Sequence, residues 1–164
     1  MSWVEGRRGF LLGAAALLSA CGFTPVFAPG SAAAGLRTRV AVSPLPGRRG
    51  FLLREGLRER FGDEGDVVYV LDVVADYRET ALSITQGAET TRFNIEGQAR
   101  YTLRSIATDA IVSQGSVRSV AAYSATGSPF AVDVAQRDAE DRLATRLAEQ
   151  IAAQVFLAAE DFAP

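Results

Sequence analysis

Two kinds of side chain in this sequence could take part in chemistry: a single thiol, that of Cys21, and close pairs of carboxylates. The pairs are Asp63 with Glu64 and Asp72 with Asp76, and two suitably spaced carboxyl groups can work together as acid and base. Asp72 and Asp76, however, lie on the polar side of an alternating stretch, where solvated carboxylates are expected. A hydrolase is therefore an alternative only, and we expect no enzymatic activity.

The rest of the composition excludes most other chemistry. All 17 basic residues are arginines, and the 164 residues include no histidine and no lysine. This leaves no Ser-His-Asp or Cys-His arrangement, no Schiff-base lysine and no Walker A loop. One cysteine without histidine gives no ordinary zinc site, and a net charge of -2 gives no general attraction to nucleic acid. We expect no metal, no cofactor and no nucleic-acid partner.

Residues 1–20 are organised as an export signal. Arg7 and Arg8 form a short basic region, and an apolar run follows from Phe10 to Ala20. The run is too short to span a hydrocarbon core of about 30 Å, but it fits the apolar region of a signal peptide. A buried core helix is the alternative, and the basic pair before the run argues against it.

Cys21 follows this signal in a context that gives its thiol a specific role. The residues Leu18-Ser19-Ala20-Cys21 resemble the lipobox of bacterial lipoproteins. The resemblance implies that diacylglycerol is attached to the Cys21 thiol, that the chain is cut before this residue and that the new amine is acylated. A thiolate is a strong nucleophile and suits such a reaction. A free buried cysteine is the alternative.

Neighbouring residues bear on the export route and the destination. The stretch Gly6–Leu12 resembles a twin-arginine signal, so export by the Sec route or by the twin-arginine route is left open. The same heptamer recurs at Gly47–Leu53, which we interpret as chance. The residue after Cys21 is Gly22, whereas in enteric bacteria an aspartate at this position retains lipoproteins in the inner membrane. We therefore expect the outer membrane.

Residues 21–36 are expected to be the lipidated cysteine and a tether, followed by a single domain over residues 37–164. The stretch after Cys21 is rich in Gly, Ala and Pro and has no charge, which is typical of a linker. Phe23, Val26 and Phe27 are apolar enough to lie in lipid headgroups, to dock on a partner or to pack on the domain. The domain contains no cysteine, so its stability must come from packing.

The pattern of apolar residues predicts six elements in this domain. They are a strand at 39–43, a helix at 49–61, strands at 67–85, 91–106 and 110–123, and a helix from 129 to about 159. The segment 91–106 has the clearest period of two, as expected where one face of a sheet is buried and the other is wet. The alternation of 67–85 breaks near Arg78 and Glu79, where we predict a β-bulge.

The last helix shows its start and its buried side in the sequence. Ser128 is a good N-cap and Pro129 stands at the favoured first position. An apolar seam with a spacing of four is thickened by alanines; its members are Leu143, Leu147, Ile151 and Val155. We expect this seam to pack on the sheet, with a coiled-coil arm as the alternative.

Together these elements predict an α+β fold, a two-layer sandwich with the order βαβββα. The crossover through the first helix should be right-handed and should make the first two strands parallel. The remaining strands form a meander, which gives a four-stranded mixed sheet. Both helices must lie on one face of this sheet, because only that face is apolar.

The start of the mature chain and the order of elements resemble the lipopolysaccharide-assembly lipoprotein family LptE, in its alphaproteobacterial form. Residues 21–27 (CGFTPVF) are similar to a family start of the type CGFxP followed by an apolar and an aromatic residue. The stretch Ser128–Ala131, which leads through residues 137–140 into a helix that continues through Gln154, is similar as well. The resemblance covers nearly all of the mature chain.

The resemblance implies a lipid-anchored, periplasm-facing protein of the outer membrane. Such a protein plugs the lumen of the LptD β-barrel and assists its assembly in lipopolysaccharide transport. The resemblance also implies a contact with lipopolysaccharide through basic residues near a strand end. Arg78 and Arg92, beside the turn at residues 86–90, are the candidates, since arginine pairs with phosphate in a bidentate manner. Glu79 and Glu89 nearby dilute a positive patch.

A second binding function stays open besides the LptD partnership. The chain could be an auxiliary lipid-binding lipoprotein of an envelope lipid transporter that captures lipid between helix and sheet. This alternative needs a cavity, which the many alanines of the last helix could leave.

Overall fold

A computed structural model describes residues 30–63, 65–84, 90–125 and 127–163. In chain order its elements are α2 (Ala32–Leu36), β1 (Val40–Val42), α3 (Gly47–Phe61), β2 (Tyr69–Ile84), β3 (Thr90–Ser105), β4 (Ile111–Ser124), α4 (Pro129–Leu157) and the 3-10 turn η1 (Ala158–Asp161). From β1 onward this is the predicted order βαβββα. The predicted export signal and Cys21 lie outside the described residues.

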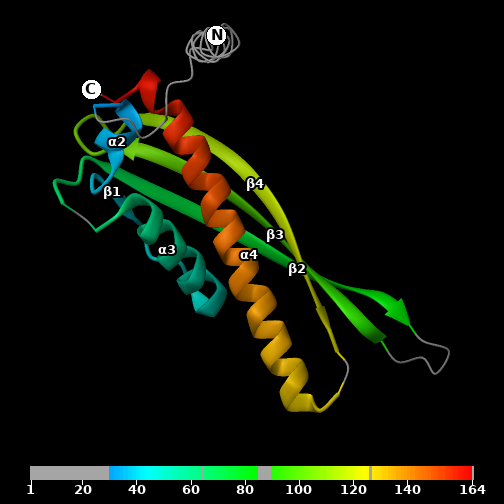
Figure 1. Ribbon diagram of the computed structural model, residues 1–164. Helices are drawn as coiled ribbons and strands as arrows, with labels where there is room; N and C mark the ends of the chain where they lie inside the picture. Colours follow the sequence, from blue (N-terminus) through cyan, green and yellow to red (C-terminus); the bar gives the residue numbers. More distant parts are fainter. Residues whose placement is uncertain (1–29, 64, 85–89, 126, 164) are drawn as a thin grey trace, which may run out of the picture.

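The strands form one sheet in the order β1-β2-β3-β4. β1 runs parallel to β2, with Val40 beside Tyr69, whereas β2, β3 and β4 pair in antiparallel fashion. The predicted four-stranded mixed sheet is therefore confirmed. β2 and β3 are long, and they extend beyond the helices at the end of the molecule away from α2 (Figure 1).

The bulge lies further along β2 than the sequence predicts. The pairing of β2 with β3 is regular through Arg78 and Glu79, and its register shifts only between Ala81 and Ile84. The predicted β-bulge near Arg78 and Glu79 was wrong, because a polar residue can lie on the inner face of the sheet without a bulge. The Tyr123 hydroxyl donates a hydrogen bond of 2.5 Å to Glu79 Oε1, so this carboxylate has a hydrogen-bond partner on the inner face.

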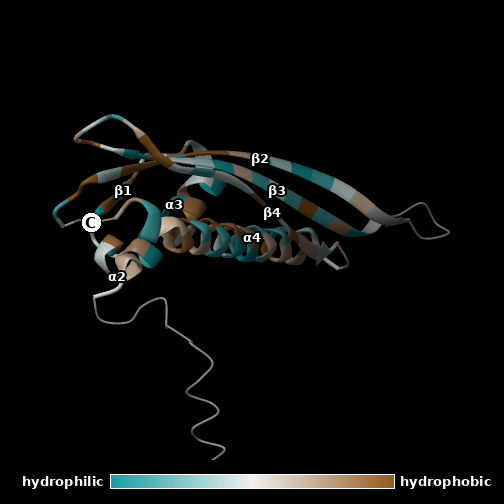
Figure 2. Ribbon diagram, turned by 90° about the horizontal axis from the view of Figure 1, so that it is seen from above, coloured by the Kyte–Doolittle hydropathy of each residue, from teal (hydrophilic) through white to brown (hydrophobic). Residues whose placement is uncertain are grey.

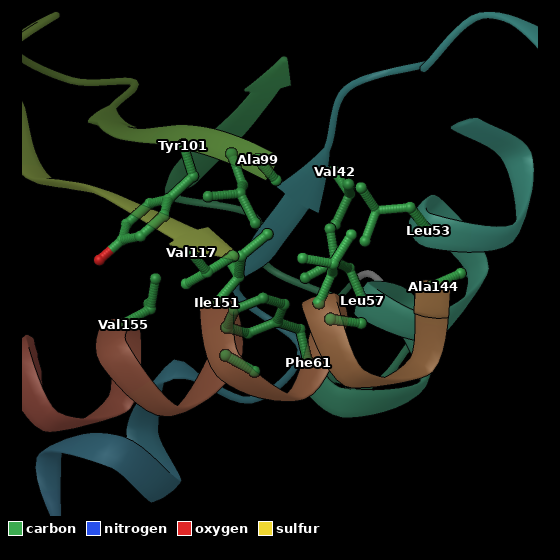
Figure 3. Close-up of a cluster of buried hydrophobic side chains, with 14 of the residues drawn as sticks. Val42, Leu53, Leu57, Phe61, Ala99, Tyr101, Val117, Ala144, Ile151 and Val155 are labelled. Atoms are coloured by element: carbon green, nitrogen blue, oxygen red, sulfur yellow. The ribbon is translucent and has the colours of Figure 1, made fainter. Parts of the chain in front are cut away.

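Both long helices pack on the same face of the sheet, as predicted (Figures 1 and 2). The seam of α4 is fully buried and is flanked by buried alanines. Figure 3 shows side chains of both helices meeting those of the strands in one core, with Leu57 and Phe61 from α3, Ile151 and Val155 from α4, and Val117 from β4. The result is the predicted two-layer α+β sandwich.

Close approaches at two glycines set the distances between the elements of the core. A Cβ atom added to Gly97 of β3 would lie 2.9 Å from Leu147 Cδ1, so α4 contacts the sheet where the strand has no side chain. A Cβ added to Gly56 of α3 would lie 3.1 Å from the Ala148 Cβ, which brings the two helices together. The small residues of α3 and α4 therefore serve to pack helix on helix.

The start of α4 follows the predicted capping pattern. The backbone N–H of Ala131 donates to Ser128 Oγ at 3.3 Å, and Pro129 occupies the first helical position. Proline suits this position because its missing N–H would have had no partner within the helix.

The prediction of a tether that extends to Leu36 is wrong for its last residues. Residues 32–36 form α2, which Ser31 caps by accepting a hydrogen bond from the Ala34 N–H at 3.1 Å. Leu36 is fully buried and Ala33 is 4% exposed, so both belong to the core. The low charge and small residues that suggested a linker are here the features of a short buried helix.

The Leu147 seam gives a direct test of this packing. Leu147→Asp places an unpaired charge against β3 and should cost at least about 4 kcal/mol, enough to unfold a marginally stable domain. Thermal unfolding followed by circular dichroism measures the effect. The exposed neighbour Gln150 supplies the control, since Gln150→Asp should change the melting temperature little. An unchanged melting temperature for Leu147→Asp would contradict a buried seam.

Candidate functional site

The outer face of the sheet, opposite the helices, is polar and cross-linked by ion pairs. Arg100 pairs with Asp76 at 3.3 Å, and Arg118 pairs with Glu96 at 3.2 Å. These pairs join β2 to β3 and β3 to β4, and their side chains are between 43% and 70% exposed. Exposed pairs contribute little to stability individually, so we interpret this face as a hydrated charged surface with no buried reactive group.

The two aspartates that suggested a hydrolase are separated on this face. Asp72 accepts a hydrogen bond from the Ser43 hydroxyl at 2.6 Å and pairs with Arg104 at 3.3 Å, whereas Asp76 pairs with Arg100. The two aspartates stand four residues apart on one strand, about 13 Å along it. Paired catalytic carboxylates stand at most about 9.5 Å apart, so the geometry does not favour joint acid–base action.

Arg78 and Arg92 also lie on the outer face, but the fold does not bring them together. Arg78 stands opposite Glu96 in the register of β2 and β3, and Arg92 lies four residues from Glu96 on β3. The two arginines are therefore about 13 Å apart along the sheet. Both are exposed, and neither forms an ion pair with another described residue. The predicted turn beside them lies at residues outside the description.

The inner face of the long hairpin carries an aromatic pair beside the Glu79 carboxylate. Phe93 stacks on Tyr123 with ring centroids 5.3 Å apart and an angle of 12° between the rings. Burial, together with the hydrogen bond to Glu79, raises the pKa of Tyr123 to about 12. This tyrosine thus keeps its proton and holds Glu79 in place across the sheet.

A groove of about 670 Å³ opens between the start of α3 and the edge of β2. Its lining consists of Leu45, Pro46, Gly47, Arg48, Arg49, Gly50, Val73, Val74, Ala75, Tyr77 and Glu140. The Tyr77 hydroxyl is buried without a hydrogen-bond partner in the described structure, and burial raises the pKa of Tyr77. The Arg49 guanidinium lies 5.4 Å from the centre of the Tyr77 ring, within the range of a cation–π contact.

Glu140 of α4 forms ion pairs with two arginines at the start of α3, which lines one wall of this groove. Arg48 donates to Glu140 at 2.6 Å, and Arg49 pairs with the same carboxylate at 2.8 Å. The Glu140 side chain is only 11% exposed. The sequence analysis did not predict this groove. The Arg48-Arg49 pair of the repeated heptamer anchors α3 to α4 through Glu140, which lies some 90 residues further along the chain.

Two kinds of site are absent from the described residues. In this part of the chain, no helix is long and apolar enough to cross a membrane. The same residues contain no cluster of three or more His, Cys, Asp or Glu side chains placed to hold a metal ion.

Solved structures with this fold include lipoproteins from several bacteria. A putative lipoprotein from Caulobacter crescentus has a TM-score of 0.68 at 21% sequence identity and covers 81% of this chain and 98% of its own. The rare lipoprotein B from Shewanella oneidensis has a TM-score of 0.52 at 14% identity and covers 74% of this chain and 94% of its own. At these identities the likeness shows the fold alone. No curated protein matches the sequence.

The chain thus falls into the structural class of two-layer α+β sandwiches that these lipoproteins share. Within this class it belongs to the LptE family, described as lipopolysaccharide-assembly, whose sequence pattern matches residues 37–155. The resemblance seen in the sequence is therefore confirmed. The match covers the chain from just before β1 almost to the end of α4, which is nearly the whole sandwich.

The pKa of Tyr123 predicts how stability depends on pH. An unfolded tyrosine titrates near about pH 10, whereas Tyr123 in the folded protein titrates near about 12. The stabilising contribution of Tyr123 is therefore complete below pH 10 and is lost as the pH rises toward 12. No lysine titrates in this interval, because the chain has none. The free energy of unfolding, measured by chemical denaturation across this interval, should decrease with rising pH, and the decrease should be smaller in Tyr123→Phe. An equal decrease in the variant would contradict the assignment.

Proposed function

We propose that this protein is an outer-membrane lipoprotein that plugs the LptD β-barrel and assists its assembly in lipopolysaccharide transport. The observation that carries the proposal is the match to the lipopolysaccharide-assembly family over residues 37–155. The structural neighbours support it, since several are themselves called lipoproteins. The proposed anchor is the lipid on Cys21, and the proposed place is the periplasmic side of the outer membrane and the barrel lumen.

The surface of the sandwich suits the inside of a large barrel. The lumen of an outer-membrane barrel is polar, and in several barrels it is filled by a plug. The outer face of this sheet is a row of exposed ion pairs, including Arg100 with Asp76 and Arg118 with Glu96. Such a face can exchange its water for the polar lining of a lumen while these pairs stay intact.

In this proposal the anchor approaches from the end of the molecule at which the described chain starts. The described chain starts at Gly30, next to α2, and η1 lies at the same end (Figure 1). The chain between Cys21 and Gly30 can reach about 30 Å at most. The last residues of β2 and the first residues of β3 lie at the opposite end of the molecule (Figure 1). In our proposal the hairpin therefore points away from the anchor.

The alternative of a lipid carrier depends on a cavity between α4 and the sheet. The alanines of α4 that suggested such a cavity instead pack against neighbouring residues of the core. Ala148 meets α3 at Gly56, and Ala144, 4% exposed, belongs to the same buried core. The alanine stripe thus packs helix against helix and gives no support to lipid capture.

An affinity purification tests the main proposal. Tagged full-length protein is extracted from outer membranes with mild detergent, and the eluate is identified by mass spectrometry. We expect an LptD-like β-barrel in stoichiometric amount. Cys21→Ala should leave an uncleaved or mislocalised precursor that recovers little barrel. Lipidated protein that elutes alone would contradict the partnership, and normal fractionation of Cys21→Ala would contradict the anchor.

We also propose that Arg78 and Arg92 contact lipopolysaccharide phosphates. The double variant Arg78→Ala/Arg92→Ala should weaken binding of purified lipopolysaccharide by about threefold to tenfold, since each of the two exposed contacts is worth roughly 0.5 kcal/mol. Arg100→Ala is the matched control, because Arg100 is exposed on the same face but already paired with Asp76. All variants should keep the wild-type melting temperature. Equal binding by the double variant and the control would contradict the contact.

A further inference from the structure

Arginine side chains cover three outward-facing carbonyl groups at the two outer edges of the sheet. From α4, Arg142 donates to the Ala122 carbonyl at 3.0 Å and Arg146 donates to the Val120 carbonyl at 3.1 Å, both on β4. At the other edge, Arg54 Nε donates to the Val42 carbonyl of β1 at 3.2 Å. Carbonyls held in this way are not available to a further strand.

β2 extends far beyond β1 and so has an edge of its own. β1 pairs only with Tyr69–Leu71, and the Ser43 N–H adds one hydrogen bond of 3.0 Å to the Leu71 carbonyl. Pro44 and Pro46 follow directly in the sequence, and the chain then enters α3. Since a proline cannot donate to a ladder, the pairing along β2 stops here.

The next residues of β2 present unpaired backbone groups on this side. The N–H of Tyr69 and the carbonyl of Leu71 both face β1. Backbone groups of a strand alternate in direction, so those of Val73, Ala75 and Tyr77 face the same side. Within the described part of the chain, no hydrogen bond reaches these groups from that side. Among the described residues, no arginine donates a hydrogen bond to them either.

The groove described above lies along this same stretch of β2. Val73, Ala75 and Tyr77 form one wall, and the other is formed by the segment from Leu45 to Gly50. The volume of about 670 Å³ is in the range of sites that hold a ligand. The buried Tyr77 hydroxyl supplies a hydrogen-bonding group without a partner in the described structure.

The charge at the groove is suited to an acidic neighbour. Arg48 and Arg49 both lie in its lining, with only Glu140 as an acidic lining residue. The Arg48 side chain stays 47% exposed although it pairs with both Glu140 and Asp141. A carboxylate on an incoming segment would therefore meet a guanidinium at the surface of the groove.

We propose that the edge of β2 from Val73 to Tyr77 binds an extended segment of a partner protein, which adds to the sheet as a strand in line with β1. Apolar side chains at alternate positions of this segment enter the groove, and an acidic side chain meets Arg48. The proposal goes beyond the partnership with a barrel, because it concerns one edge and holds for any partner that offers such a segment.

A strand fits these observations better than an acyl chain does. An acyl chain could fill the apolar groove, but it would leave the N–H and carbonyl groups of Val73, Ala75 and Tyr77 without partners. A strand can form hydrogen bonds with these backbone groups and place its apolar side chains in the groove at the same time. The difference can be measured, because only a strand depends on the backbone N–H groups.

Two proline variants test this dependence. Ala75→Pro removes one outward-facing N–H of β2, a substitution that an edge strand tolerates where this group makes no ladder hydrogen bond. Ala122→Pro is the matched control on β4, since the Ala122 carbonyl faces the other edge and its N–H faces the same way. Thermal unfolding establishes that both variants are folded.

The probe is a random library of nine-residue peptides displayed on phage and selected against the detergent-solubilised full-length protein. We expect enriched peptides with apolar residues at alternate positions and at least one acidic residue. They should bind Ala75→Pro at least tenfold more weakly than the wild type, and Ala122→Pro within twofold of it. In the wild type, bound peptide should slow amide hydrogen exchange at Val73, Ala75 and Tyr77.

Several results would overturn the proposal. One is a selection on the wild type that enriches no more peptides than a selection on Ala75→Pro. Another is equal peptide binding by the wild type and Ala75→Pro, which would indicate that the groove takes apolar groups without strand pairing. Slowed exchange on β4 instead of β2 would also refute it. The exchange measurement uses the wild type alone, so it tests whether the peptide binds at the edge of β2 even if Ala75→Pro does not fold. The isolated protein is used throughout, so the result is independent of the barrel purification.

Discussion

The contact of α4 with β3 at Gly97 is the constraint on which the rest of the structure depends. The strand has no side chain where the helix presents Leu147, so the leucine reaches the sheet itself. A helix this close buries its entire seam, and α3 then fits beside it through Gly56 and Ala148. Two helices packed in this way cover one face of the sheet. The other face must consequently be polar.

This one-sided arrangement separates the surfaces of the protein by function. The outer face is charged and hydrated, and ion pairs such as Arg100 with Asp76 link its strands. Arginines from the helices hold three carbonyl groups at the two outer edges, whereas the stretch of β2 beyond β1 stays open above a groove. A protein that works by contact with partners needs such a division, because each surface can be recognised without disturbing the core.

The sequence predicts those features that depend on neighbours along the chain. The alternation of β3, the seam of α4 and the Ser128 cap are local patterns, and together with the chain order they define the sandwich. Other features depend on residues far apart in sequence. Leu36 could be assigned to the core only once α2 had a place on the folded domain. Arg48 and Arg49 meet Glu140 some 90 residues away, so no local pattern reveals the groove that they border.

The candidate site shows the same limit. The outward direction of Arg78 and Arg92 follows from alternation, and the structure agrees with it. Their separation depends on the register between two strands, which the sequence alone does not specify. The tolerance of Glu79 on the inner face likewise depends on Tyr123, which reaches it from β4, two strands away.

The exclusive use of arginine has a consequence for how the protein responds to its surroundings. Histidine and lysine are both absent, and residues 37–164 contain no cysteine, so the domain has none of the side-chain types that ordinarily titrate near neutral pH. The sandwich therefore has almost no buffering capacity across the neutral range.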